Sequence, residues 1–318
     1  MLHAVPERET MTRSVRVMAV ALVLTVSGPA VIWAQNRAQR TADTDQTVDV
    51  VKGARLSVNN FAGEVVVKVW EKNAVRVTAR HSSRTKVAIR NSDTVVAIES
   101  TSSTGVASVD MEITAPNWMP VKVDGTYNFV SVEGAQAEIA VETVRGDIVI
   151  RGGTGFVTAK SIEGEVIVEG ASGRINVSSV NEGIRITGAT GDIVAETTNG
   201  SISLSKVEAK VVEVTTVNGD VSYDGNLAQG GRYRFATHNG DIVLTVPETA
   251  SATFVVRTYN GDFVNNLGLK GSGEGRRGRR VTYVLGSGSA EVELESFGGD
   301  ISVRKPGTTT REKDHGKE

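Results

Sequence analysis

Five acidic side chains each follow directly after a glycine of a repeated turn. They are Asp147, Glu165, Asp220, Asp241 and Asp262. Carboxylate oxygens are the ligands that Ca²⁺ takes in proteins, so Asp220, Asp241 and Asp262 offer a weak calcium-binding edge. Gly183 and Ser201 interrupt the series. We favour the alternative, a solvated edge whose carboxylates accept backbone N–H groups of the turn, and we predict no dedicated metal site.

A short basic segment is the second candidate site. Residues 270–280 carry five positive charges and one negative charge. The positive residues are Lys270, Arg276, Arg277, Arg279 and Arg280. Such a segment could bind phosphate, lipopolysaccharide or an acidic partner. We favour the alternative, which is a solvated insertion in the repeats.

Reactive side chains are scarce in the rest of the sequence. Cysteine is absent, which excludes disulfides, thiolate metal sites and a cysteine nucleophile. The four histidines do not share a metal-ligand spacing, and no Ser-His-Asp set or phosphate loop appears. His238 is the one histidine inside the repeats, and we expect a turn residue there. The sequence therefore predicts a non-catalytic protein without cofactors, with a carbohydrate-active β-helix enzyme as the weaker alternative.

The acidic residues belong to units that begin every nine residues. Ten consecutive units begin at Asn128, Ala137, Gly146, Gly155, Gly164, Gly173, Glu182, Gly191, Gly200 and Ala209. The third and fifth positions of each unit are apolar or small, apart from Glu213. Apolar residues two positions apart indicate a short strand with one buried face. Looser copies begin at Gly219, Gly231, Gly240, Ala252, Gly261, Arg279, Ala290 and Gly299.

Two kinds of turn alternate between the units, so the true repeat has 18 residues, two strands and two corners. One such repeat cannot enclose a core, whereas copies stacked about 4.8 Å apart bury a continuous one. We therefore predict an all-β fold, a parallel β-solenoid in which each strand pairs with its counterpart 18 residues later. A hexapeptide helix would show a shorter period, and a calcium-binding nonapeptide roll would need regular Gly-Gly and Asp positions.

The corner that reads T-V-N-G-D-V at 216–221 predicts its own stacking contacts. Asn tolerates a positive φ and Gly prefers it, so we expect Asn-Gly to turn the chain at low energetic cost. Stacked Asn side chains can hydrogen-bond along the axis, and the preceding Ser or Thr suits a local hydroxyl bond. Replacing Gly200 or Gly219 by Val is expected to destabilise the stack.

The two ends of the chain differ from the repeats. The first 34 residues have the pattern of an export signal that starts from Met11, with Ala34 at the cleavage position. A retained membrane anchor at 17–34 is the alternative. Residues 35–47 indicate a linker, 48–120 an N-terminal β region or cap, 121–304 the solenoid, and 305–318 a disordered tail.

The composition limits the partners of the protein. A formal net charge of −2 gives no overall attraction to nucleic acid or to anionic membranes. Aromatic residues make up only 5% of the chain, and the many Val and Ile residues favour strands. We expect an exported protein in the periplasm or at the cell surface, whose partner is an unidentified protein or glycan of the envelope.

Four parts of the sequence share the pattern of one known family. They are L-S-V-N-N-F-A-G-E-V-V-V-K-V-W at 56–70, V-D-M-E-I-T-A-P at 109–116, the tandem T-x-N-G-D-I units and the closing run at 285–303. They resemble the bacterial exported β-strand-repeat proteins catalogued as putative adhesins, which are related to auto-transporter adhesin heads. The resemblance covers residues 48–304 and implies an envelope-associated β-solenoid without established catalytic residues. It favours an adhesin or scaffold, and a membrane-anchored partner in envelope stress is the alternative.

Overall fold

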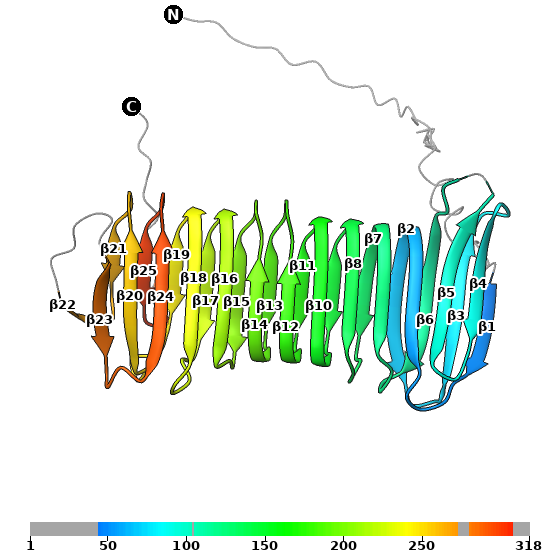
Figure 1. Ribbon diagram of the computed structural model, residues 1–318, viewed down its shortest axis with the longest axis horizontal. Helices are drawn as coiled ribbons and strands as arrows, with labels where there is room; N and C mark the ends of the chain where they lie inside the picture. The colour runs from blue at the N-terminus through cyan, green and yellow to red at the C-terminus, as the bar shows by residue number, and fades with distance from the viewer. Residues whose placement is uncertain (1–43, 104, 273–279, 308–318) are drawn as a thin grey trace, which may run out of the picture. The chain divides into compact units, whose positions relative to one another are not determined.

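The computed structural model describes residues 44–103, 105–272 and 280–307 (Figure 1). Strands, turns and loops make up this part of the chain, and it contains no helix that is long and apolar enough to cross a membrane. The described strands belong to one compact unit. The predicted export signal or anchor at 1–34 and residues 308–318 of the predicted tail lie outside the described residues.

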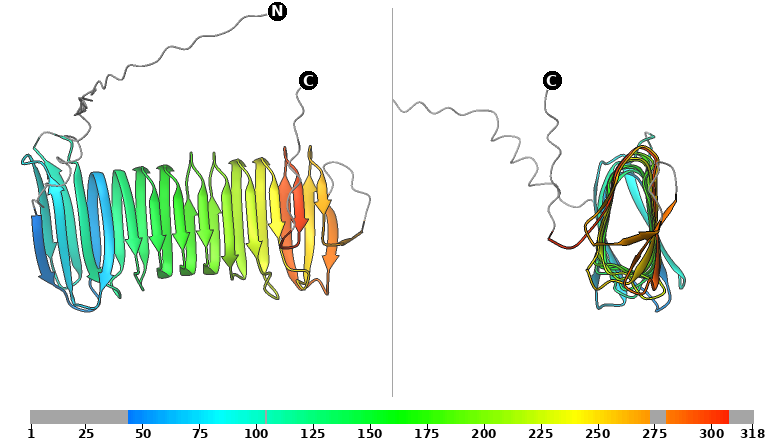
Figure 2. Two further views of the ribbon diagram at one scale, coloured as in Figure 1. Left: turned by 180° about the vertical axis from the view of Figure 1, so that it is seen from behind. Right: turned by 90° about the vertical axis from the view of Figure 1, so that its left-hand side faces the viewer.

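The repeats form two rows of parallel strands that face each other across the core (Figures 1 and 2). Row A comprises β8 (Ile139–Arg145), β10 (Thr154–Glu163), β12 (Ser172–Ser178), β14 (Thr190–Glu196), β16 (Val211–Asn218) and β18 (Arg232–Asn239). Row B comprises β9 (Ile148–Arg151), β11 (Val166–Glu169), β13 (Ile184–Thr187), β15 (Ile202–Val207), β17 (Val221–Gly225) and β19 (Ile242–Thr245). Val166 lies opposite Ile148 and Ile184. The predicted parallel β-solenoid and its 18-residue step are therefore confirmed in these coils.

Aliphatic side chains fill the space between the two rows. Ile148, Val166, Ile184 and Ile202 form one continuous line in the core, and each is almost completely buried. The strands alternate between buried and outward side chains, so only one face of each strand contributes to this core. The covering of each coil by the next supplies the apolar contacts that a single coil lacks.

The core becomes aromatic toward the C-terminal coils. The ring centroid of Tyr223 lies 6.0 Å from that of Tyr233 and 5.2 Å from that of Phe235. The hydroxyl of Tyr223 donates to the Asn226 carbonyl at 2.7 Å, and burial raises the pKa of Tyr223 well above its usual range. The coils here are longer than 18 residues, since Val221 of β17 pairs with Ile242 of β19. The larger aromatic side chains fill the core of these longer coils.

One extra residue shifts the phase of the repeat at Lys206. Its φ is 53°, and it is the single non-glycine residue with a positive φ in the described part of the chain. The pairing of β15 with β17 changes register at this residue. After the bulge Val212 and Val214 face the core, whereas Val211 and Glu213 are exposed. The prediction that Val211 and Glu213 occupy the inward positions is therefore wrong by one residue.

At the N-terminal end the first long strand is a complete coil. Strand β2 (Arg55–Trp70) runs through both rows and pairs in parallel with β7 (Val121–Glu133) on one side. On its other side it pairs with β5 (Val95–Ser102) and β6 (Val109–Pro116). The outer strands pair in antiparallel orientation: β4 (Thr85–Asn91) pairs with β5, β3 (Ala74–His81) pairs with β6, and β1 (Thr44–Asp49) pairs with β3. The predicted cap at 48–120 thus contains a solenoid coil, and β1 begins inside the predicted linker.

At the C-terminal end the last coil of the sequence lies inside the stack. Strands β24 (Ala290–Ser296) and β25 (Ile301–Arg304) pair with β18 and β19 on one side. On the other side they pair with β20 (Ala252–Thr258) and β21 (Phe263–Asn265). An antiparallel hairpin of β22 (Lys270–Ser272) and β23 (Val281–Leu285) continues row A beyond β20.

The order of the coils therefore departs from the order of the sequence at both ends (Figure 1). We expected each unit to stack on its predecessor, and this holds from β7 to β19 but not beyond. The solenoid unit predicted at Arg279 is wrong, because β23 runs antiparallel to β20. An inserted coil has partners on both edges, so β2 and the β24–β25 coil present no open strand edge to other molecules.

Candidate functional site

The candidate site is the corner with the N-G-D motif, where each coil passes from row A to row B. Because the coils pair in register, equivalent corner residues of successive coils lie next to one another. Side chains of one kind therefore form files that run along the stack. Four files lie around this corner, and they are a hydroxyl file, an amide file, an acidic file and an apolar file.

The hydroxyl file is buried and joins successive coils. Its members are Thr143, Ser161, Ser179, Thr197, Thr216, Thr237 and Ser296. Ser161 Oγ donates to the Gly146 carbonyl at 3.1 Å, and Thr216 Oγ1 donates to the Gly200 carbonyl at 3.0 Å. The predicted local bond also occurs, since the Gly299 N–H donates to Ser296 Oγ at 3.0 Å. These hydroxyls satisfy buried backbone groups and hold the corner in place.

The amide file lies outside the hydroxyl file and is exposed. It consists of Asn181, Asn199, Asn218 and Asn239. The Nδ2 of Asn199 donates to Asn181 Oδ1 at 3.2 Å, and the Nδ2 of Asn218 donates to Asn199 Oδ1 at 2.8 Å. The Nδ2 of Asn239 donates to Asn218 Oδ1 at 2.9 Å. The predicted hydrogen bonding between stacked Asn side chains is confirmed.

Asn218→Ala should lower the free energy of unfolding by about 1–2 kcal/mol, because it removes two amide hydrogen bonds of the file. Asn181→Ala is the matched control, because Asn181 accepts one such bond at the end of the file. Its loss should be about half as large. Urea denaturation of both variants measures the difference. Equal losses at the two positions would contradict the dependence of stability on the number of amide hydrogen bonds.

The acidic file contains the predicted carboxylates and one more. In spatial order its C-terminal members are Asp220, Asp241, Asp300 and Asp262. Asp241 Oδ1 accepts the Asp300 N–H at 2.8 Å, and Asp300 Oδ1 accepts the Asp262 N–H at 2.9 Å. The carboxylates thus accept N–H groups of the neighbouring coil rather than of their own turn. No group of three His, Asp or Glu side chains within the described ranges is arranged to hold a metal ion.

Close packing requires the glycines of this corner, and only Gly146 and Gly240 among its glycines before an acidic residue also have a positive φ, 128° and 159°. At Gly164, Gly200 and Gly219 the φ is not positive, but a Cβ would overlap the backbone of the neighbouring coil. Positive φ values occur at the opposite corner, for example 65° at Gly170 and 64° at Gly188. The expectation that Asn-Gly turns the coils through a positive φ is therefore wrong at Gly200 and Gly219, whereas Gly240, which follows Asn239, has a positive φ. Glycine is needed here because adjacent coils lie close together. The sequence of one turn does not show this distance.

The apolar file lies on the outer side of row A beside the amide file. In spatial order its ten positions are Phe61, Thr126, Val144, Ile162, Val180, Thr198, Val217, His238, Phe297 and Tyr259. Val144, Ile162, Val180 and Val217 remain between 39% and 45% exposed. In the sequence these residues alternate with small residues at the opposite corner. That alternation predicts two kinds of corner. It does not predict that the side chains of the file are exposed to solvent, which the structure shows.

Aromatic side chains enlarge the apolar file at both ends. The rings of His238 and Phe297 stack with centroids 4.7 Å apart and planes 8° apart, and Tyr259 lies 5.2 Å from Phe297. At the other end, the ring of Phe61 lies 5.5 Å from that of Tyr127. The inserted coil creates the first cluster, because it places Phe297 between two residues that precede it in the sequence. His238 lies in β18, one residue before its end, and not in a turn as expected, and it belongs to this surface.

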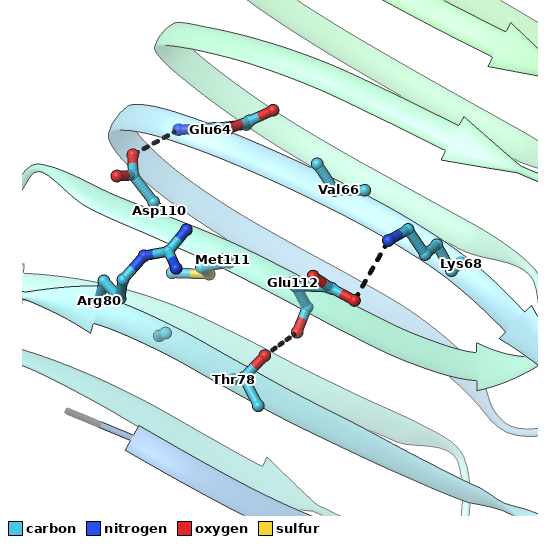
Figure 3. A pocket seen from close by; sticks show the side chains of 9 residues that line it. Glu64, Val66, Lys68, Thr78, Arg80, Asp110, Met111 and Glu112 are labelled. Carbon is cyan, nitrogen blue, oxygen red and sulfur yellow. Dashed lines mark hydrogen bonds and ion pairs between the residues drawn. The ribbon is translucent and has the colours of Figure 1, made fainter. Parts of the chain in front are cut away.

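A shallow concavity of about 300 Å³ lies on β2, β3 and β6 at the N-terminal end (Figure 3). Lys68 Nζ donates to Glu112 Oε1 at 3.2 Å, and Asp110 Oδ1 accepts the Glu64 N–H at 3.1 Å. Thr78 Oγ1 donates to the Glu112 carbonyl at 3.1 Å (Figure 3). The carboxylates of Glu112 and Asp110 are therefore engaged with neighbouring strands, which favours a structural role for this concavity.

The predicted basic segment is described at its two ends. Lys270 begins β22, and Arg280 precedes β23. The Nη2 of Arg280 donates to Glu293 Oε1 at 2.5 Å, so this cation forms an ion pair with β24. Arg276, Arg277 and Arg279 lie outside the described residues. A binding role for the segment therefore stays a prediction.

Two solved structures are similar to this chain. One is a putative cell adhesion protein from Clostridium sporogenes ATCC 15579, with a TM-score of 0.29 and 13% identity, and the match covers 82% of this chain and 99% of that chain. The other is a putative adhesin from Parabacteroides distasonis ATCC 8503, with a TM-score of 0.27 and 13% identity over 82% of this chain and 96% of that chain. No curated protein matches the sequence.

A family model confirms the family relationship that the strand repeats predict. The model described as Toastrack DUF4097 matches residues 32–304. This range contains every strand of the structure, from β1 to β25. Because the match spans the coils, the inserted ends and the N-G-D corner together, the protein belongs to the Toastrack DUF4097 family.

Proposed function

We propose that the protein is a non-catalytic adhesin or scaffold of the cell envelope and that the apolar file is its binding surface. The observation that carries the proposal is the run of exposed aliphatic side chains at Val144, Ile162, Val180 and Val217. Contiguous apolar surface in contact with water marks interaction sites, whereas single exposed apolar residues need no explanation. The file is contiguous because the coils pair in register.

The stability of the coil gives no reason for these positions to be apolar. Thr198 occupies the same position between Val180 and Val217, and it is exposed as well. A polar β-branched side chain therefore fits this position of the coil as well as Val does. Contact with a partner explains why the positions on either side of Thr198 are apolar.

The polar groups next to the file support a role without catalysis. The amides of Asn199 and Asn218 bond to each other, and the carboxylate of Asp220 accepts the Asp241 N–H at 2.9 Å. A general acid, base or nucleophile needs a polar group that can reach the substrate. The corner instead uses its polar groups to join coils, which suits a rigid support for a binding surface.

The N-terminal sequence supports the envelope location. Residues 1–34 have the composition of an export signal, and the absence of cysteine excludes lipid attachment to an N-terminal Cys. Sequencing the mature N-terminus from isolated envelopes should give a start near Gln35. An intact segment at 17–34 would favour the anchored alternative.

A fourfold variant tests the binding surface. Its changes are Val144→Thr, Ile162→Thr, Val180→Thr and Val217→Thr. The changes follow the natural example of Thr198, so we expect the free energy of unfolding to change by no more than about 1 kcal/mol. Binding to cell envelopes isolated from the producing bacterium, measured by cosedimentation, should weaken at least about tenfold.

The matched control removes the same number of exposed apolar side chains outside the file. Its changes are Val51→Thr, Val106→Thr, Val211→Thr and Val264→Thr. These residues are also exposed, and the control should bind envelopes as the unmodified protein does. Unchanged binding by the file variant, or an equal loss in the control, would contradict the proposed surface.

A further inference from the structure

The spacing of the apolar file restricts what can lie along it. Neighbouring strands are about 4.8 Å apart, so ten positions span about 43 Å. An extended peptide repeats its side chains on one face every 6.8 Å or so, and it loses register with the file within a few coils. A second copy of this chain has the same step, and its file stays in register over the full length.

The backbone at the file excludes binding by strand addition. The Asn181 N–H donates to the Ile162 carbonyl at 3.0 Å, and the Asn199 N–H donates to the Val180 carbonyl at 2.7 Å. An added strand needs unpaired N–H and C=O groups at a sheet edge. The file lies in the middle of the stacked coils, so an occupant meets side chains only.

We infer that the apolar file is a self-association surface on which two copies pack antiparallel to each other. The inference rests on the proposed function, because it names the partner of the same surface. An antiparallel pair places Phe61 of one copy opposite Tyr259 of the other, so the aromatic clusters at the two ends meet. The twofold axis passes between Val180 and Thr198, and it places Val180 opposite Thr198 and Ile162 opposite Val217.

The side chains beside the file face each other only in the antiparallel arrangement. Arg145 and Glu163 are the charged residues at the positions that the Asn side chains occupy in later coils. A parallel pair, related by a twofold axis along the file, would place these rows on opposite sides of the paired files, so they would not meet. In the antiparallel pair Arg145 lies opposite Asn239, and Glu163 lies opposite Asn218.

The size of the file makes the association weak and reversible. A surface about 43 Å long and about 10 Å wide covers about 430 Å² on each copy. The total lies below the roughly 1,200 Å² that stable interfaces bury. Self-association should therefore appear at high protein concentration, with a dissociation constant in the micromolar range or weaker, on the order of 10–1,000 µM.

Cross-linking tests the geometry, because the chain has no native cysteine. Under mild oxidation, an equal mixture of the Phe61→Cys and Tyr259→Cys variants should form a disulfide-linked dimer, and so should a mixture of Val180→Cys and Thr198→Cys. Phe61→Cys alone should remain monomeric. A dimer of Phe61→Cys alone would overturn the antiparallel arrangement, since only parallel copies bring these residues together.

Sedimentation velocity tests whether a second copy of the chain is the partner of the apolar file. The sedimentation coefficient of the full chain should rise with concentration, and the fourfold Thr variant of the file should stay monomeric while the control variant behaves as the unmodified protein. A chain that stays monomeric at millimolar concentration overturns self-association. If the file variant still loses envelope binding in that case, the proposed function survives and the occupant is a glycan or another envelope protein. Normal association of the file variant together with unchanged envelope binding contradicts both.

Discussion

Gly219→Ala should lower the free energy of unfolding by about 3 kcal/mol or more. The φ of Gly219 is not positive, so the loss does not come from an unfavourable turn conformation. A Cβ at this position overlaps the carbonyl of Gly200 in the preceding coil, which belongs to the backbone and cannot rotate away. The two coils must separate locally, and they then lose the hydroxyl bond from Thr216 Oγ1 to the same carbonyl.

Gly170→Ala is the matched control at the opposite corner. Its φ is 65°, and a Cβ there meets no atom within 4 Å. The variant should lose about 1–2 kcal/mol, which is the energy of placing an ordinary residue in the left-handed region. Urea denaturation compares the two variants. A smaller loss for Gly219→Ala than for Gly170→Ala would mean that close packing of coils does not decide where glycine is needed.

Ending the chain after Leu285 should remove on the order of 10 kcal/mol of stabilisation from the C-terminal coils. The truncation deletes β24 and β25, whose side chains Val292, Leu294, Ile301 and Val303 are fully buried. Strands β20 and β21 reach the stack only through these two strands. Without them, β20, β23 and β22 retain a small antiparallel sheet in that order, and a sheet of this size is marginally stable by itself.

A chain that also lacks β20 to β23 is the matched comparison for this truncation. A chain that ends after Val246 should melt at the same temperature as the one that ends after Leu285, because the extra residues have no coil to join. Trypsin should cut the longer one rapidly after Arg257. A chain that ends after Gly307 should match the full chain in both measurements. Protection of Arg257 in the chain ending at Leu285 would show that β20 can stack directly on β18.

The architecture of the central coils could be predicted because its physical causes are local and regular. Apolar residues two positions apart define strands, and a constant step of nine residues aligns Ile148 with Val166 and Ile184. The Asn side chains of the corner follow from the same alignment. Where one residue is added, as at Lys206, the same reasoning misplaces the inward pair by one position, and the sign of the shift in the sequence is the charged Glu213 at a predicted inward position.

The order of the end coils could not be predicted for a different reason. The coils at 232–245, 252–265 and 290–304 carry similar corners and similar inward residues, so any of them can stack on any other. Their order depends on the connections and on the hairpin of β22 and β23, which a periodic pattern does not describe. The exposure of the apolar file could not be predicted either, because the sequence does not show which side of the corner faces solvent.

The inserted coils at the two ends have a consequence for how such proteins can change in length. The β24–β25 coil has partners on both sides, so a coil added after β25 in the sequence would find no free edge of β25 on which to stack. Between β8 and β15 each coil meets its neighbours through the same 18-residue step. Relatives should therefore gain or lose length in the middle, one whole turn of the solenoid at a time, while both terminal arrangements stay unchanged.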